Sequence, residues 1–313
     1  RVLALFAPRA SFLTVRFSLV TIDSEPTIPA PNRNSHPPTA FQPPPGACDA
    51  HCHIFGPAHK FPFSQDSTYI PPDSGLEEFE RLQERLGLSR AVFVQASCHG
   101  TDNRAMVDAI IRGNGRYAGV AMIDESFTDR QIEELHEVGV RGTRFNFVAH
   151  LGGAPELPVF WRLVHRVAKL NWHIVLHFDA KDLPTYAPML DDMPVPYVID
   201  HMARVDATQG VDQEPFQQLL ELMKDERAWV KITGAERLTA SGTPPYDDVV
   251  PIAQALVAAA PERVLWGTDW PHPNVRAMPD DGDLVDTLAL FVPEEKLRNQ
   301  ILVTNPERIY DFG

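Results

Sequence analysis

Eight short runs rich in β-branched and aromatic residues recur along this chain, and a longer stretch separates each run from the next. Such runs predict strands, at residues 48–55, 90–97, 117–123, 140–147, 172–178, 195–201, 228–234 and 263–269. Apolar residues recur at intervals of three and four in residues 75–86, 102–112, 128–138, 158–170, 213–224 and 246–260, which predicts helices that pack on a sheet. This alternation favours an α/β fold of the (β/α)8 TIM-barrel type over a doubly wound sheet.

The first 47 residues differ in composition from the rest of the chain. Residues 1–20 are apolar with interspersed arginines and superficially resemble a targeting segment, but their apolar stretches are too short to span a bilayer. Residues 24–46 contain eight prolines, a composition that favours extended, poorly ordered chain. We therefore expect two parts: a poorly ordered arm, residues 1–47, and a barrel domain, residues 48–313.

Charge and cysteine content restrict the partners and the compartment. A formal net charge of −14 argues against nucleic acid or an anionic membrane surface as a partner. The three cysteines, Cys48, Cys52 and Cys98, are an odd number without zinc-finger spacing, which predicts reduced thiols and a cytoplasmic protein. A nucleotide cofactor is not expected, because no glycine-rich phosphate loop follows any predicted strand. The sequence does not predict an oligomeric state.

Four predicted strands end in side chains that bind metals or transfer protons. His51 and His53 are two residues apart on the first strand and therefore point to the same side. His177, His201 and Asp269 end the fifth, sixth and eighth strands. Any one of these histidines could be a hydrogen-bonded core residue or a surface residue. All five, however, meet at one face if the strands form a parallel barrel, which favours a functional site.

The residue types indicate the chemistry of this site. His51, His53, His177 and Asp269 could hold one divalent ion and leave a position for water, and zinc, or alternatively manganese, suits these ligands. A divalent ion activates water for hydrolysis and polarises a carbonyl group. Asp269 is then the candidate to take the water proton and deliver it to the leaving oxygen. His201 could orient the water or donate a hydrogen bond to the carbonyl oxygen.

Three arginines near strand ends suggest an anionic substrate. Arg144, Arg204 and Arg237 are expected on the same rim, and several guanidinium groups together bind a compact di- or polyanion. Each arginine could instead form a structural ion pair. Tyr69 could contact the substrate or simply pack, and Ser97 could contact it or form a turn. Ser97 is not expected to be a nucleophile, because it lacks the glycines of a G-x-S-x-G elbow.

Five motifs together resemble a known family. They lie at residues 49–57 (DAHCHIFGP), 100–104 (GTDNR), 142–147 (GTRFNF), 199–201 (IDH) and 266–272 (WGTDWPH). They are similar to motifs in the lactonase branch of the amidohydrolase superfamily, above all in the 2-pyrone-4,6-dicarboxylate hydrolases and the 4-sulfomuconolactone hydrolases. The resemblance runs from about residue 49 to the end of the chain. It implies a (β/α)8 barrel that hydrolyses an anionic lactone from the degradation of aromatic compounds.

The resemblance also implies roles for individual residues. His51, His53, His201 and Asp269 fall on active-site positions of the family, and the three arginines fall on its carboxylate-binding positions. Two residues depart from the pyrone-dicarboxylate hydrolases that work without metal: His177 replaces a tyrosine, and His150 replaces a further arginine. The first change favours dependence on a metal, and the second removes a cationic contact from the substrate-binding residues. Both changes favour an enzyme of the sulfomuconolactone type.

The leading hypothesis is therefore a metal-dependent lactonase that acts on a small anionic lactone, with 4-sulfomuconolactone as the expected substrate. A 2-pyrone-4,6-dicarboxylate lactonase, with or without metal, is one alternative. A metal-dependent decarboxylase of a muconate-like or aromatic acid is another, because related barrels carry the same ligand set. A binding protein with a degenerate barrel is disfavoured, because degeneration would erase at least one of the five metal or proton-transfer positions.

Overall fold

Eight parallel strands form the central sheet of the protein. The computed structural model describes residues 25–148 and 153–312. The strands follow one another in the sheet in chain order, each paired in parallel with the next. They are β1 (Cys48–Cys52), β2 (Arg90–Val94), β3 (Tyr117–Ala121), β4 (Val140–Asn146), β5 (His173–His177), β6 (Tyr197–Ile199), β7 (Ala228–Lys231) and β8 (Val264–Leu265). Each lies within a predicted strand.

Backbone hydrogen bonds between β1 and the segment that follows β8 close this sheet into a barrel. The Ala50 amide donates to the Trp266 carbonyl at 2.9 Å, and the Asp269 amide donates to the His51 carbonyl at 2.7 Å. Gly267 lies at the closest approach, where an added Cβ would be 2.4 Å from the His51 nitrogen. A glycine is therefore required where the barrel closes. The predicted (β/α)8 fold is confirmed.

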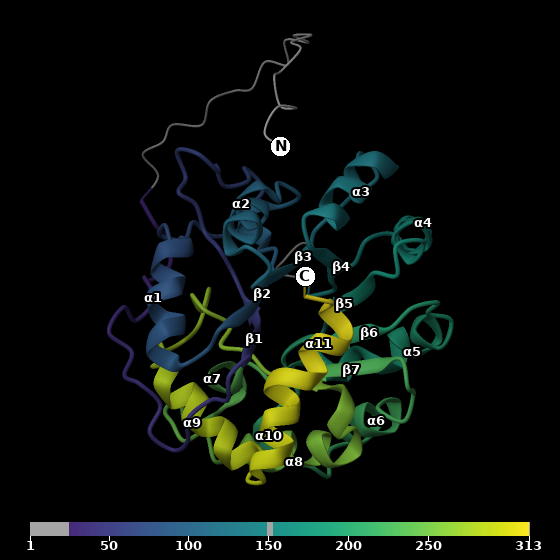
Figure 1. Ribbon diagram of the computed structural model, residues 1–313. Helices are drawn as coiled ribbons and strands as arrows, with labels where there is room; N and C mark the ends of the chain where they lie inside the picture. Colours follow the sequence, from purple (N-terminus) through teal and green to yellow (C-terminus); the bar gives the residue numbers. More distant parts are fainter. Residues whose placement is uncertain (1–24, 149–152, 313) are drawn as a thin grey trace.

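Helices surround the barrel in Figure 1. They are α1 (Leu76–Leu86), α2 (Arg104–Gly113), α3 (Asp129–Glu137), α4 (Leu157–Ala168), α5 (Leu183–Asp191), α6 (Glu214–Leu222), α7 (Ala235–Leu238), α8 (Val250–Ala259), α9 (Asp281–Phe291), α10 (Glu295–Asn299) and α11 (Asn305–Tyr310). The buried residues of α1, such as Phe79, Leu82 and Leu86, recur at three and four and face the strands. Within the described residues, no helix combines the length and the apolar character that crossing a membrane requires.

Successive side chains of a strand point to opposite faces, so the barrel has an inner and an outer apolar layer. Both layers stabilise it. In β2, Phe93 packs with the helices, whereas Val92 and Val94 belong to the cluster inside the barrel. The inner cluster also contains Trp229 of β7 and Val175 of β5. This packing fixes the carboxyl ends of the strands relative to one another, so that side chains at those ends keep a defined geometry.

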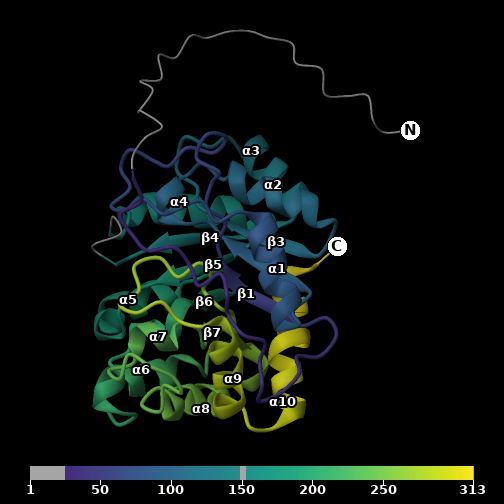
Figure 2. The ribbon, with the colours of Figure 1, turned by 90° about the vertical axis from the view of Figure 1, so that its left-hand side faces the viewer.

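The proline-rich segment at residues 25–47 contains no helix or strand and lies against the start of α9 (Figure 2). Ser35 is buried, and its hydroxyl donates to Asp281 at 2.9 Å. The amides of Thr39 and Ala40 donate to the Asp286 carboxylate, each at 2.7 Å. Composition alone favours poor order here, but these contacts with the acidic residues of α9 fix the course of residues 25–47.

Candidate active site

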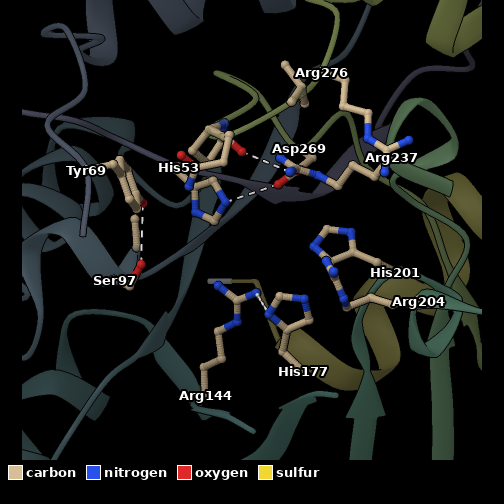
Figure 3. Close-up of a pocket in the computed structure, with 14 residues that line it drawn as sticks. His53, Tyr69, Ser97, Arg144, His177, His201, Arg204, Arg237, Asp269 and Arg276 are labelled. Carbon is tan, nitrogen blue, oxygen red and sulfur yellow. Dashed lines mark hydrogen bonds and ion pairs between the residues drawn. The ribbon is translucent and has the colours of Figure 1, made fainter. Parts of the chain in front are cut away.

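The carboxyl ends of the strands surround a cavity of about 260 Å³ (Figure 3). Asp269, His53 and Arg144 contribute to its wall, and His51 lies fully buried behind His53. Other predicted residues that line it are Tyr69, Ser97, His177, His201, Arg204 and Arg237. His150 lies outside the described residues. The fold therefore gathers the other predicted side chains around one cavity, although they come from eight separate segments of the chain.

Asp269 lies at the centre of this group. Its Oδ1 is 3.1 Å from His53 Nε2 and 3.4 Å from His51 Nε2. Its Oδ2 accepts a hydrogen bond from Arg237 Nε at 2.6 Å and forms an ion pair with Arg237 Nη2 at 2.5 Å. Burial by itself would raise the pKa of this carboxyl, but Arg237 and the neighbouring histidines hold it well below its usual range. Asp269 is therefore an ionised carboxylate with one oxygen fixed by an arginine and the other facing the histidines.

The hydrogen bonds of His53 fit a metal ligand. Its Nδ1 lies 2.7 Å from the Val94 carbonyl oxygen, which can only accept, so Nδ1 carries the hydrogen. The Nε2 atom then carries a lone pair and lies 3.1 Å from the Asp269 carboxylate. Because both atoms are acceptors, this short distance requires a proton or a cation between them. A histidine whose other nitrogen donates to a carbonyl is the usual arrangement of metal-binding histidines. His53 and Asp269 therefore fit a divalent ion.

His51 contributes a second buried imidazole nitrogen, Nε2, beside Asp269. Its other ring nitrogen, Nδ1, contacts a cluster of charged side chains. His51 Nδ1 lies 3.3 Å from Asp200 Oδ1 and 2.9 Å from Lys231 Nζ. Lys231 and Asp200 are themselves paired at 3.1 Å, and Arg144 Nε lies 3.0 Å from Asp200. Burial and the Lys231 charge lower the pKa of His51 well below its usual range. His51 is thus a neutral imidazole, and its Nε2 has no hydrogen-bond partner among the described residues. This nitrogen can bind a metal when the ring hydrogen lies on Nδ1, facing Asp200, but not when Nδ1 accepts from the Lys231 ammonium, which can only donate.

His177 and His201 lie side by side, with ring centroids 5.3 Å apart. Arg144 contacts His177 Nδ1 at 3.1 Å, and the buried Nε2 of this ring has no hydrogen-bond partner in the described part of the chain. Burial lowers the pKa of both imidazoles, that of His201 to about 3. Potential ligand atoms of His51, His201 and Asp269 lie within 4.8 Å of one another, a group of described residues that does not include His177. The structure thus brings His201 closer to the predicted metal ligands than the sequence suggests.

The backbone at His201 adopts an unusual conformation. All four residues from His201 to Arg204 have φ between 50° and 51°, in the left-handed region, and none is glycine. The His201 ring is held by a 2.8 Å contact between Nδ1 and Thr233 Oγ1. A Cβ added at Gly234 would be only 3.0 Å from the same Nδ1, so glycine leaves room for the ring. The left-handed turn places both His201 and Arg204 at the cavity.

The three predicted arginines all line the cavity, and each is paired with a carboxylate of the protein. Arg144 is paired with Asp200, and Arg237 with Asp269. Arg204 Nε donates to Asp179 at 2.6 Å. Each arginine therefore forms an ion pair, and its place in the cavity lining also allows it to contact a substrate.

Tyr69 and Ser97 lie on another wall of the cavity, with their hydroxyl oxygens 3.4 Å apart. Burial raises the pKa of the Tyr69 phenol, which therefore keeps its proton and can donate a hydrogen bond to a bound anion. Arg276, which the sequence analysis did not identify, also lines the cavity. Asp200 and Lys231 were missed as well, although alternation from the inward-facing Trp229 would have placed Lys231 inside the barrel.

Glu236, Asp269 and His272 form a second group of buried potential ligands within 4.8 Å of one another. Glu236 accepts no hydrogen bond from any described residue, and burial raises the pKa of its carboxyl. Arg237 Nε lies 3.4 Å from Glu236 Oε1 and also bonds Asp269. The Arg237 guanidinium thus already supplies a positive charge between the two carboxylates, so this group gives no reason to expect a second metal ion.

Comparisons with known proteins agree with this geometry. A 2-pyrone-4,6-dicarboxylate hydrolase from Comamonas testosteroni is 44% identical over 86% of this chain and 92% of its own. A 4-sulfomuconolactone hydrolase from Hydrogenophaga intermedia is 42% identical over 87% of this chain and 91% of its own. The structure of a probable 2-pyrone-4,6-dicarboxylic acid hydrolase from Acinetobacter baumannii, with citric acid bound, has a TM-score of 0.76 and 27% identity over 85% of this chain and all of that one. The amidohydrolase family model matches residues 48–312, and the chain belongs to this family.

Proposed function

We propose that this protein hydrolyses a small anionic lactone and that 4-sulfomuconolactone is its substrate. The observation that carries the proposal is an ionised Asp269 beside buried imidazole nitrogens, in a cavity that arginines line. The similarity to 4-sulfomuconolactone hydrolases supports the choice of ring. 2-Pyrone-4,6-dicarboxylate is the second candidate, because a hydrolase of that compound is equally similar.

The proposed metal ligands are His51, His53, His177 and Asp269, with zinc as the expected ion and manganese as the alternative. When bound there, a divalent ion would lower the pKa of a water molecule and polarise the lactone carbonyl. His201 is the competitor of His177 for the fourth ligand position, because it lies nearer to His51 and Asp269.

Asp269 is the proposed proton carrier. Its low pKa keeps it ionised, so it can accept a proton from the water that attacks the carbonyl carbon. The carbon–oxygen bond of the ring then breaks, and the same proton passes from Asp269 to the leaving oxygen. Arg237 holds Oδ2 throughout, which leaves Oδ1 as the atom that exchanges the proton. A neutral His201 can orient the water or donate to the carbonyl oxygen, depending on which ring nitrogen carries the hydrogen.

The wall of the cavity supports an anionic single-ring substrate. A volume of about 260 Å³ accommodates one small ring with its substituents. Arg144 has one guanidinium nitrogen, Nη1, beyond those that contact Asp200 and His177, and Tyr69 adds a neutral donor. The Acinetobacter relative has citric acid, a compact polyanion, bound in its structure.

The decisive experiment combines metal analysis with rate measurements. Protein purified without added metal is assayed with 4-sulfomuconolactone and 2-pyrone-4,6-dicarboxylate, before and after chelation and again after zinc or manganese is restored. We expect about one metal ion per chain and chelator-sensitive ring opening. Failure of the metal-loaded protein to open either lactone would refute the proposed reaction. Release of carbon dioxide without ring opening would identify a decarboxylase instead.

Two sets of variants test the proposed roles. Asp269→Asn is expected to abolish turnover, whereas Asp212→Asn, at an exposed position remote from the cavity lining, serves as the matched control. His177→Ala is expected to lose the metal, and His201→Ala to keep it with lower turnover. The opposite pattern of metal content would make His201 the fourth ligand.

The compartment and the domain division are also proposals. All three cysteines are buried and unpaired, which supports a reducing cytoplasmic environment. We further propose that residues 48–313 form the catalytic barrel domain and that residues 1–47 are an arm that takes no part in the chemistry.

A further inference from the structure

Four arginines line the cavity, but nearby carboxylates offset part of their positive charge. Arg144, Arg204 and Arg237 each have a carboxylate partner within 3.0 Å, and in each pair the guanidinium Nε contacts that carboxylate. A substrate anion must therefore share these three guanidinium groups with Asp200, Asp179 and Asp269. Sharing weakens the attraction that each of them offers to a second negative charge.

Arg276 differs from the other three arginines. It lines the same cavity, yet it makes no ion pair and no side-chain hydrogen bond with any residue in the two described ranges. Its guanidinium is solvent-exposed and lies on the segment that follows β8. In Figure 3, Arg276 lies on the same side of the cavity as Arg237, whereas Arg144 and His177 lie on the opposite side. Both edges of its planar fork are therefore available to an anion at the cavity mouth.

The base of the segment that carries Arg276 is firmly held. The Pro273 carbonyl accepts a hydrogen bond from Arg237 Nη1 at 2.8 Å. The His272 ring is buried and bonds Asp281 at 2.9 Å. The chain is thus fixed three residues before Arg276, next to the arginine that holds Asp269. Because this segment is held beside the cavity, a ligand bound in the cavity can also contact Arg276.

We propose that Arg276 is a specificity-determining residue that binds an acidic substituent of the lactone at the cavity mouth, which in 4-sulfomuconolactone is the sulfonate. This inference rests on the proposed function and extends it: the preferred substrates carry an acidic group on the side of the ring facing away from Arg144. Arg276 touches that substituent and not the scissile ester. It therefore acts on substrate binding, and the chemical step depends on Asp269 and the histidines.

The test compares two lactones that differ by one anionic group: 4-sulfomuconolactone and muconolactone, which lacks the sulfonate. For Arg276→Gln, we expect KM for the sulfonated lactone to rise roughly tenfold, with kcat within about twofold of the wild type. KM for muconolactone should change by less than about twofold, because no sulfonate contact is lost. Arg276→Lys keeps the charge without the planar fork and should give an intermediate KM.

Arg81→Gln is the matched control, because Arg81 is also exposed and lies on α1, away from the cavity lining. It removes the same charge and should leave both KM values unchanged. An unchanged KM for the sulfonated lactone in Arg276→Gln, or equal increases for both lactones, would overturn the role of Arg276.

A binding measurement separates this inference from the proposed reaction. Calorimetric titration with isophthalate, a compact dianion, and benzoate, its monoanionic counterpart, requires no turnover. Isophthalate should bind more weakly to Arg276→Gln than to the wild type, and benzoate equally to both. If the wild type opened no lactone but this difference appeared, the reaction would be refuted and the anion site kept. If the wild type opened the sulfonated lactone and isophthalate bound both proteins equally, the anion site would be refuted alone.

Discussion

Lys231→Met removes one charge from a fully buried ion pair at the end of β7. Lys231 Nζ lies 3.1 Å from Asp200 Oδ1, and neither side chain is exposed to solvent. At an effective dielectric constant of about 20, two unit charges at this distance attract each other by about 5 kcal/mol. Methionine has a similar length and volume, so the substitution removes the ammonium group without opening a large cavity.

The net loss of stability is expected to be smaller than this attraction. Asp200 keeps Arg144 at 3.0 Å, so the carboxylate is not left entirely without a counter-charge. We expect the free energy of unfolding to fall by about 3 kcal/mol, at the lower end of the range for breaking a buried pair. Urea unfolding followed by tryptophan fluorescence measures the change, provided that the slope of the transition is unchanged.

A control variant and a double variant test the reasoning behind this value. Lys60→Met breaks a pair with Asp108 of similar length, but the Lys60 side chain is 54% exposed, so the loss should stay below about 1 kcal/mol. Lys231→Met combined with Asp200→Asn should be less destabilised than the sum of the two single variants, by at least about 1 kcal/mol. If Lys231→Met were as stable as the wild type, the ammonium group would not be compensating Asp200, and the reasoning would be wrong.

Three further changes probe the barrel closure, the arm and the turn beside the cavity. Gly267→Ala should lower the free energy of unfolding by more than about 2 kcal/mol and reduce the amount of bound metal, because the added Cβ would lie 2.4 Å from the His51 nitrogen. A urea unfolding curve and a metal content equal to those of the wild type would contradict this. The Pro37 carbonyl and Asp283 raise the pKa of His36, so its stabilising contribution is complete below pH 6.5 and is lost as the pH rises through the raised value. His36→Gln should abolish this small dependence in melting curves taken at several pH values. Ala203→Gly should raise stability by about 1 kcal/mol in urea unfolding, because glycine accepts the left-handed conformation without a steric penalty.

The barrel and most of the cavity lining could be predicted from the sequence because a general rule of topology connects them. Parallel strands in a closed barrel bring their carboxyl ends to one face, so His53, His177 and Asp269 had to approach one another once the strands were identified. α5 was missed because Pro184 and Pro188 interrupt the helical pattern. Leu183, Met189 and Leu190 of this helix pack in the outer apolar cluster, a tertiary contact that no local pattern reveals.

The charged cluster beneath the histidines could not be predicted from local patterns. Alternation along β7 places Lys231 inside the barrel, but only the closed barrel shows that it contacts His51 and Asp200. Arg276 lies in a segment without periodic pattern, so its place at the cavity depends on how the chain turns after β8. The pairing of Arg204 with Asp179 likewise joins residues from two different strand ends.

The left-handed turn after β6 shows that the positions of His201 and Arg204 depend on an unusual backbone conformation. Left-handed conformation costs about 1–2 kcal/mol for a residue other than glycine, and His201 to Arg204 adopt it four times in succession. Such a cost persists only where the surroundings compensate for it. Here the His201 ring contacts Thr233, and Arg204 pairs with Asp179, so both ends of the turn are anchored by side-chain contacts. A right-handed turn would direct these two side chains differently, and the site would lose an imidazole within 4.8 Å of His51 and Asp269 together with one of its arginines. The strain is therefore best understood as the cost of presenting an imidazole and a guanidinium to the same cavity from four consecutive residues.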